Sequence, residues 1–204
     1  MRALALLVSY VLHPLWTPVL LLGLLWMLDP WLRLQPGVMI YVATVLLINA
    51  VAPAVSIFML HRRGVLSDLE VSERKERKWP FLIVLFYQVL GYFALTRPGV
   101  YLPPEVLGLV VAMMAALVVA IFVNRHFKMS MHLLANGGAF GAVWSFNQLH
   151  GLGLEAWLPL GFLLAGVVGW SRMRLGVHTP KELALGFLVG HALMRAVVEW
   201  GWMG

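Results

Sequence analysis

Residues 171–182 read SRMRLGVHTPKE. This polar, basic stretch lies between two apolar segments, one ending at Trp170 and the other running from Leu183 to Trp200. Apolar segments of about this length predict membrane helices, so the stretch predicts a turn at the membrane surface. An arginine, a histidine and a carboxylate close together at such a position indicate a function beyond joining two helices.

The composition predicts an integral membrane protein. The chain has 204 residues, of which 61% are hydrophobic and 12% are charged. A water-soluble domain could not cover so much apolar surface with so few charges, and the length fits one compact unit. We therefore expect a single multi-pass membrane domain over residues 1–204, with the bacterial cytoplasmic membrane as its location. The absence of cysteine excludes disulfides and thiol chemistry but leaves the compartment open.

Seven apolar runs approach the length of a membrane-spanning helix. They cover residues 3–28, 37–60, 80–97, 105–124, 133–149, 156–170 and 183–203. Two of these runs are short and rich in glycine, so the sequence predicts an all-α membrane bundle of six to seven transmembrane helices. The first run is too long for the apolar part of a cleaved signal peptide and is expected to be the first membrane helix. We divide the domain into an N-terminal helical hairpin, residues 1–60, and a core, residues 61–204.

Small and polar residues inside the runs predict how the helices pack. Gly137-x-x-x-Gly141 and Gly186-x-x-x-Gly190 have the spacing of close helix–helix contacts. Isolated polar side chains within the apolar runs are expected to form interhelical hydrogen bonds, and these are His13, Asn49, Gln88 and Asn147. A group at four-residue spacing, expected to pair along the last helix, consists of His191, Arg195 and Glu199.

Lysine and arginine residues concentrate in three connecting loops. Threading seven spans places residues 61–79, 125–132 and 171–182 on one face of the membrane. These loops hold 11 of the 15 Lys and Arg residues. The positive-inside rule would make that face cytoplasmic, but an anion site needs cations on either side, so the orientation stays open. The net charge of +6 then indicates lipid head groups or an anionic substrate as partners, and not nucleic acid.

The first two loops admit structural and functional interpretations. Four cations precede Trp79-Pro80 in the first loop, where a solvated segment that sets topology is the simpler interpretation: Arg74, Lys75, Arg77 and Lys78. The second loop places Ser130 and His132 at the start of a helix. There a hydroxyl and free backbone N–H groups can hold an anion, and an imidazole can exchange a proton. Zinc is not expected, because no cysteine or carboxylate lies nearby to complete a ligand set.

The third loop has the form of a helix start. Thr179 is expected as the N-cap, Pro180 as the first helical residue and Glu182 as the acidic partner of a capping box. Glu182 would also lie within a turn of His178, where a carboxylate can hold an imidazole in one tautomer. The other ring nitrogen would then be free to attack phosphorus. The sequence leaves open whether Glu182 caps the helix, aligns His178 or does both.

The same residues resemble the type-2 phosphatidic acid phosphatase superfamily, which shares its site with vanadium haloperoxidases. The third motif of that family is Ser-Arg, five residues, His, three residues, Asp. Here Ser171-Arg172, His178 and Glu182 match it at every spacing, with one acid exchanged for the other. The second motif, Pro-Ser-Gly-His, corresponds to Met129-Ser130-Met131-His132. The first motif, Lys, six residues, Arg-Pro, survives loosely in residues 74–80. The resemblance covers roughly residues 60–200 and makes 61–204 a phosphatase-like core.

The resemblance implies a role for each matched residue. His178 would be the nucleophile that forms a phosphohistidine, Glu182 would orient it, and His132 would protonate the departing alkoxide and later activate water. The phosphoryl oxygens would be held by Arg172, Ser130, Ser171 and a cation from residues 74–78. No metal or other cofactor is expected, because converging cations can stabilise the transferred phosphoryl group. Three departures from the family pattern are Met131 for Gly, Trp79 for Arg and Glu182 for Asp.

The leading hypothesis is a membrane phosphatase that hydrolyses a lipid or polyprenyl mono- or diphosphate. Its partners would be a phospholipid or isoprenoid phosphate and the surrounding membrane lipids. A second hypothesis is a lipid phosphotransferase, which passes the phosphoryl group to an acceptor other than water. A third is a binder or transporter of anionic lipid that has lost hydrolysis. The oligomeric state is left open.

Overall fold

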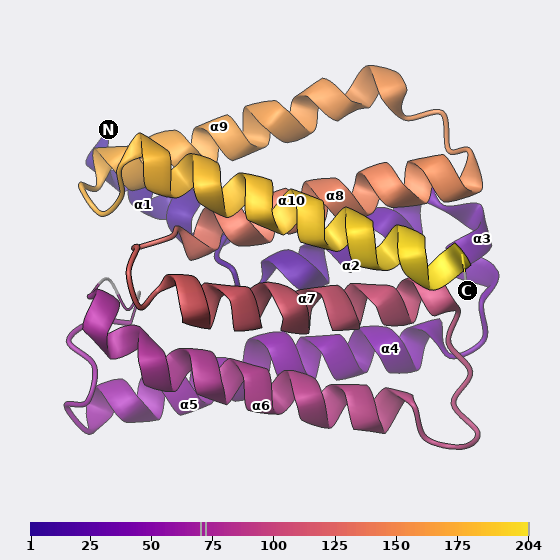
Figure 1. Cartoon of the computed structure of the whole chain (residues 1–204), viewed down its shortest axis with the longest axis horizontal. Helices are drawn as coiled ribbons and strands as arrows, with labels where there is room; N and C mark the ends of the chain where they lie inside the picture. The colour runs from indigo at the N-terminus through magenta and orange to yellow at the C-terminus, as the bar shows by residue number, and fades with distance from the viewer. Residues whose placement is uncertain (70, 72, 204) are drawn as a thin grey trace.

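A computed structural model shows a bundle of helices that run roughly along one common axis (Figure 1). The structure describes residues 1–69, 71 and 73–203, and all regular secondary structure in that part of the chain is helical. The predicted all-α class is therefore confirmed. Residues 70, 72 and 204 of the predicted single domain lie outside the described residues.

The helices follow one another with short connections. In chain order they are α1 (Arg2–Val11), α2 (Thr17–Leu28), α3 (Pro30–Leu34), α4 (Val38–Val45), the π-helix η1 (Leu46–Val51), α5 (Ala52–Arg62), the 3₁₀-helix η2 (Arg74–Arg77), α6 (Lys78–Leu95), α7 (Pro104–Val123), α8 (Met131–His150), the 3₁₀-helix η3 (Glu155–Trp157), α9 (Leu158–Arg174) and α10 (Pro180–Met203). Proline opens α7 and α10, where its missing N–H is not needed. Gly151 ends α8 with a left-handed backbone, at a φ of 61°.

Within the described residues, five segments are long and apolar enough to cross a membrane, as expected for a multi-pass membrane protein. They are Val38–Arg62, Arg74–Leu95, Pro104–Val123, Glu155–Arg174 and Pro180–Trp200. The expected count of six to seven is therefore too high. The segment predicted at 133–149 does form a long helix, α8. However, its glycines and polar residues lower its mean hydropathy. These residues suit its place inside the bundle, where α8 packs against α10, α9, α2 and α7.

The predicted first membrane helix, residues 3–28, is wrong. The structure divides it into α1 and α2, both shorter than a membrane span, with a turn at His13-Pro14. A proline disfavours the helical conformation of the residue before it and cannot donate a backbone hydrogen bond. The carbonyl of His13 instead accepts from Thr17 N and Thr17 Oγ1, both at 3.1 Å. The turn places the His13 side chain inside the bundle.

Glycines bring α8 and α10 into close contact, as the two predicted motifs indicated. A Cβ atom added at Gly137 would lie 2.1 Å from the carbonyl oxygen of Phe187, and one at Gly190 would lie 2.1 Å from that of Leu134. At Gly186, an added Cβ would lie 2.5 Å from the carbonyl oxygen of Ser130. Side chains larger than hydrogen would therefore push the start of α8 away from the first turns of α10.

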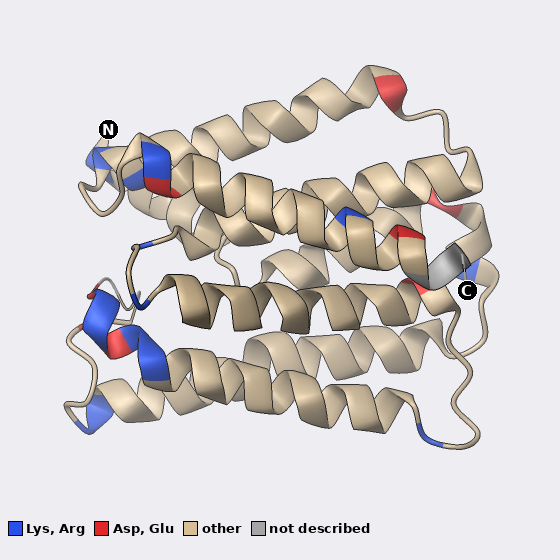
Figure 2. Cartoon of the chain, viewed as in Figure 1, with Lys and Arg blue, Asp and Glu red and all other residues tan. Residues whose placement is uncertain are grey.

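Charged residues gather at the two ends of the bundle, and most Lys and Arg residues lie at one of them. The three basic loops meet at the end where α5, α7 and α9 finish and where α6, α8 and α10 begin (Figure 2). Their predicted placement on one face is therefore confirmed. Asp29, Glu105 and Glu155 lie at the opposite end, together with Arg33 and Arg97 (Figure 2). We refer to these two regions as the cationic end and the acidic end.

Candidate functional site

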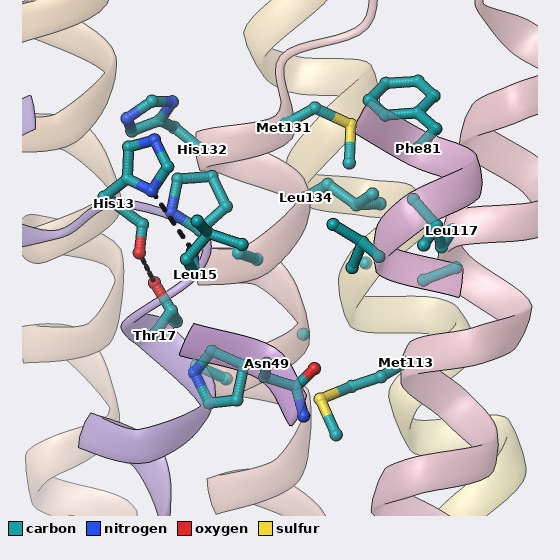
Figure 3. A pocket seen from close by; sticks show the side chains of 18 of the residues that line it. His13, Leu15, Thr17, Asn49, Phe81, Met113, Leu117, Met131, His132 and Leu134 are labelled. Atoms are coloured by element: carbon teal, nitrogen blue, oxygen red, sulfur yellow. Dashed lines mark hydrogen bonds between the residues drawn. The ribbon is translucent and has the colours of Figure 1, made fainter. Parts of the chain in front are cut away.

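A pocket extends from the cationic end into the bundle. Four of the predicted site residues line it, namely Arg77, His132, Arg172 and His178. The rest of its lining is mostly apolar and comes from α2, α6, α7, α8 and α10, with side chains such as Phe81, Met113, Leu117 and Leu134 (Figure 3). The tertiary structure thus brings residues from all three basic loops to one chamber. A polar ligand group fits at its cationic end and an apolar one beyond.

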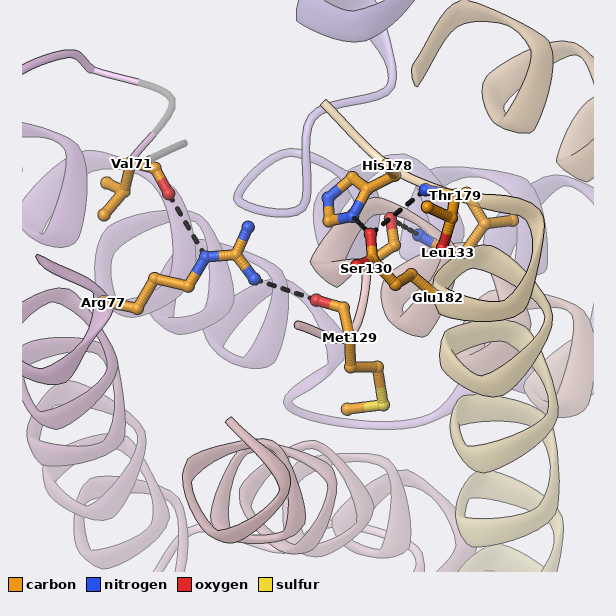
Figure 4. Close-up of polar contacts among 8 residues, drawn as sticks. All are labelled: Val71, Arg77, Met129, Ser130, Leu133, His178, Thr179 and Glu182. Carbon is orange, nitrogen blue, oxygen red and sulfur yellow. Dashed lines mark hydrogen bonds and ion pairs between the residues drawn. The ribbon is translucent and has the colours of Figure 1, made fainter. Parts of the chain in front are cut away.

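His178 lies in the turn before α10 and is held by Glu182. Its Nδ1 donates to Glu182 Oε2 at 2.8 Å, and the backbone N–H of Thr179 donates to the same oxygen at 3.1 Å (Figure 4). Glu182 therefore both caps the helix and aligns the imidazole, which answers the question that the sequence left open. With Nδ1 carrying the proton, Nε2 of the neutral ring keeps its lone pair.

Burial and positive neighbours set the protonation of His178. The side chain is buried, and burial is the main reason that its pKa falls from the usual value to about 4. Arg77 and Arg172 lower the pKa of His178 further, whereas the hydrogen bond to Glu182 opposes this change. At neutral pH the ring is therefore uncharged, which is the form that can attack an electrophile.

Ser9 on α1 joins Arg172 to His132. A guanidinium N–H of Arg172 donates to Ser9 Oγ at 2.6 Å, and His132 Nε2 donates to the carbonyl oxygen of Ser9 at 3.2 Å. All three side chains are buried. Sequence reasoning missed Ser9, because a serine in an apolar helix carries no spacing signal that connects it to residues at positions 132 and 172.

Arg77 is the cation of the first loop that reaches the pocket. It is buried, and its guanidinium donates to the carbonyl oxygens of Val71 at 3.2 Å and Met129 at 2.9 Å. Figure 4 shows the guanidinium directed toward the side of the chamber where His178 lies. Trp79, which occupies the position where the resemblance leads one to expect an arginine, is exposed. Arg77, two residues earlier in the chain, is buried and lines the pocket.

The other cations of the first loop lie away from the pocket lining. A guanidinium N–H of Arg74 donates to the carbonyl oxygen of Arg125 at 3.0 Å, which ties the first loop to the second. Lys75 and Lys78 are exposed, and the Lys78 ammonium lies 5.5 Å from the centre of the Trp79 ring. Their predicted contact with phosphate stays a prediction.

Two predicted serines are buried in hydrogen bonds with the backbone. Ser130 is the N-cap of α8, where its Oγ accepts from Leu133 N at 3.4 Å and its backbone N–H donates to the carbonyl oxygen of Glu182 at 3.1 Å. Ser171 Oγ donates to the carbonyl oxygen of Val168 at 2.8 Å. Neither serine is among the residues that line the pocket. Their binding of phosphate stays a prediction, and the contacts described here hold the second and third loops together.

His13 is a further histidine in the pocket. Its ring lies edge-on to that of His132, with 5.2 Å between the ring centres, and its Nδ1 accepts from Leu15 N at 3.3 Å (Figure 3). The sequence placed His13 within a continuous helix as an interhelical hydrogen-bonding group. The proline at position 14 was the signal that could have indicated a turn there.

Comparisons with family models, with curated proteins and with solved structures found no match to this chain. The chemistry of the pocket therefore carries the functional argument. Within the described part of the chain, no three His, Cys, Asp or Glu side chains are grouped so that they could hold a metal ion. Two guanidinium groups beside two imidazoles form a site that suits a multiply charged oxyanion.

Proposed function

We propose that the protein is a membrane phosphatase that hydrolyses a lipid or polyprenyl mono- or diphosphate, acting in the bacterial cytoplasmic membrane. The observation that carries this proposal is one pocket with Arg77, His132, Arg172 and His178 at its cationic end and apolar side chains beyond them. This division matches a ligand with an anionic head and a hydrocarbon tail. The activity is also the one that the resemblance to the type-2 phosphatidic acid phosphatases implies.

The first chemical step is attack by His178. Arg77 and Arg172 bind the phosphoryl oxygens, and Nε2 of the neutral imidazole forms a bond to phosphorus as the bond from phosphorus to the leaving oxygen breaks. Glu182 accepts the hydrogen bond from Nδ1 and stabilises the positive charge that the ring acquires. The leaving oxygen departs as the lipid alkoxide, or as the shorter phosphate in the case of a diphosphate.

His132 gives a proton to the leaving oxygen in the first step and takes one from water in the second. Its Nε2 donates to the carbonyl of Ser9, so Nδ1 is the atom that gives a proton to the leaving oxygen. The bound phosphate provides the negative charge that favours the protonated imidazole beforehand. In the second step, Nδ1 takes a proton from water, and the hydroxide attacks phosphorus as the bond to His178 breaks. The products are inorganic phosphate and the lipid alcohol, or inorganic phosphate and the lipid monophosphate when the substrate is a diphosphate.

The test is phosphate release by purified protein in detergent. Phosphatidic acid, lysophosphatidic acid and isoprenoid mono- and diphosphates are supplied in turn, each with EDTA. We expect release from at least one of them, undiminished by EDTA, no release by His178→Ala and severely slowed release by His132→Ala. Full activity in both variants would refute the proposal. Tight binding without turnover at any pH would instead favour the binder, and turnover that requires an added alcohol would favour the phosphotransferase.

A further inference from the structure

An amide pair lies in the same pocket, on the side away from the cationic end. Asn49 belongs to the π-helix η1, within the membrane span Val38–Arg62, and Gln88 belongs to α6. Gln88 Nε2 donates to Asn49 Oδ1 at 3.1 Å, and the two side chains are 5% and 2% exposed, respectively. The sequence had predicted both as interhelical hydrogen-bonding groups, and this hydrogen bond confirms it.

The pair retains one donor and one acceptor. Among the described residues, neither Asn49 Nδ2 nor Gln88 Oε1 has a hydrogen-bond partner, although both are buried. Exchanging the nitrogen and oxygen of both amides preserves the bond between them and again leaves one donor and one acceptor. Buried polar groups without partners are uncommon in folded proteins, and each carries a desolvation cost. A structural clasp between two helices needs only the one bond that is already made.

The local backbone adds a second indication. The π-helix at residues 46–51 inserts a wider turn into an otherwise α-helical span, and such turns occur often at functional sites. Figure 3 shows the Asn49 side chain in the pocket near Met113. Both amides are among the residues that line the pocket.

The spacing of the two polar regions along the chain follows from α6. Arg77 ends η2 directly before α6, and Gln88 comes eleven residues later, which corresponds to a backbone rise of about 16 Å at the α-helical rise per residue. Between them the pocket is lined by apolar residues such as Phe81, Val84 and Leu117. A ligand that reaches both regions therefore has an anionic group, an apolar chain and a hydrogen-bonding group in that order.

We propose that Asn49 and Gln88 form a second polar subsite that binds a hydroxyl group on the hydrocarbon chain of the phosphorylated ligand. A hydroxyl supplies one donor and one acceptor, which are the two roles that the unpaired amide atoms require. The inference rests on the proposed function in one respect, since the cationic end must bind the phosphate of the same molecule. It names a substrate class, namely hydroxylated single-chain lipid phosphates.

The test measures binding without hydrolysis. Dodecylphosphonate and ω-hydroxydodecylphosphonate, whose carbon–phosphorus bond resists hydrolysis, are titrated into purified protein by calorimetry. The same two ligands are titrated into the double variant Asn49→Leu/Gln88→Met, which replaces both amides by apolar side chains of similar size. We expect the ratio of the two affinities to favour the hydroxylated ligand by about tenfold more in the wild type than in the double variant.

The chain-length dependence is a second arm that needs no variant. ω-Hydroxyoctyl- and ω-hydroxyhexadecylphosphonate are expected to show less benefit from the hydroxyl than the dodecyl ligand, each compared with its plain alkyl counterpart, because the spacing of the two polar regions is fixed. An affinity ratio that is the same in the wild type and the double variant would overturn the inference and assign the amides to water or to helix packing. Because binding is the readout, the two proposals can fail separately. The protein can prefer the hydroxylated ligand without hydrolysing any lipid, or it can hydrolyse a lipid without preferring the hydroxylated ligand.

Discussion

Both ends of the bundle contain a histidine beside a carboxylate, buried in the case of His178 and partly buried in the case of His150, yet their surroundings differ. At the cationic end, Glu182 holds one nitrogen of His178, and the remainder of the ring faces a pocket that also contains two arginines. At the acidic end, His150 Nδ1 lies 2.5 Å from Asp29 Oδ2, and its Nε2 lies 3.4 Å from Glu105 Oε1. Both carboxylates there are fully buried.

The difference separates the histidine that we propose to react from one that is held on both sides. His150 has a carboxylate at each nitrogen, and the rings of Trp31 and Phe146 lie against it, with centres 4.4 and 5.2 Å away. It does not line the pocket that we describe. A histidine–carboxylate pair therefore does not identify a site by itself. The open ring nitrogen and the neighbouring guanidinium groups of His178 do so.

The largest expected effect is the loss of activity when the histidine of the cationic end is removed. His178→Gln should lower kcat for phosphate release by at least about ten-thousandfold, because the nucleophile is lost. The matched variant His150→Gln at the acidic end should keep near-normal activity in the fraction that folds. The measurement is release of inorganic phosphate per folded molecule. Similar losses in both variants would mean that the two histidines do not differ in function.

The second-largest loss of activity is expected when the carboxylate of Glu182 at the cationic end is replaced by an amide. Glu182→Gln should lower kcat by about a thousandfold, because an amide can no longer stabilise the positive imidazole and can favour the wrong tautomer. Asp29→Asn, the corresponding change at the acidic end, should leave kcat unaffected. Burial lowers the pKa of His178 to about 4, so in the wild type the pH profile of kcat/KM should fall only as the pH drops through that value.

The sign of the pH shift sharpens the same prediction. The hydrogen bond from His178 to Glu182 favours the protonated ring and thus raises the pKa of His178. Removing that charge in Glu182→Gln should therefore move the acid limb of kcat/KM to lower pH, even as the rate falls. An acid limb that moves to higher pH would contradict the geometry described for this pair.

A smaller effect is expected from Arg172, which we propose to bind the phosphoryl oxygens. Arg172→Gln should lower kcat/KM by about a hundredfold, because one cationic donor to the transition state is lost. The control is Arg97→Gln, an exposed arginine at the acidic end, which should have no effect. Steady-state kinetics with the best substrate of the screen measures both. Equal kinetics in Arg172→Gln and the wild type would show that Arg172 does not stabilise the transition state.

The smallest effect on activity, and a clear one on stability, is expected at the acidic end. Asp29 accepts from Trp31 N at 2.9 Å as the N-cap of α3 and holds His150 with its other oxygen. Asp29→Ala should lower the free energy of unfolding by about 3 kcal/mol, because it removes both the N-cap bond to Trp31 and the carboxylate at Nδ1 of the partly buried His150. Thermal unfolding in detergent should show a lower Tm with kcat unchanged. A lower kcat at unchanged Tm would contradict this prediction and would indicate that the acidic end takes part in the reaction.

Much of the site was visible in the local sequence. The capping pattern at Thr179, Pro180 and Glu182 predicted the turn that holds His178, and the apolar runs predicted helices that join the three basic loops at one end. Glycines at four-residue spacing predicted the close contact of α8 and α10. Each of these features depends on residues within a turn or two of one another, and helix periodicity makes such relations readable from the chain.

Other features were settled only in three dimensions. The choice of Arg77 among four neighbouring cations, the contact of Ser9 with Arg172 and His132, and the turn at His13 depend on which helix packs beside which. The same holds for the pairing of Asn49 with Gln88 and of Asp29 with His150. An apolar run shows that a helix suits a membrane but not which neighbour it packs against, since lipid tails and apolar side chains are equally apolar. The sequence by itself determined a helical membrane protein with a cationic end, and the packing of its helices decided which polar side chains share a pocket.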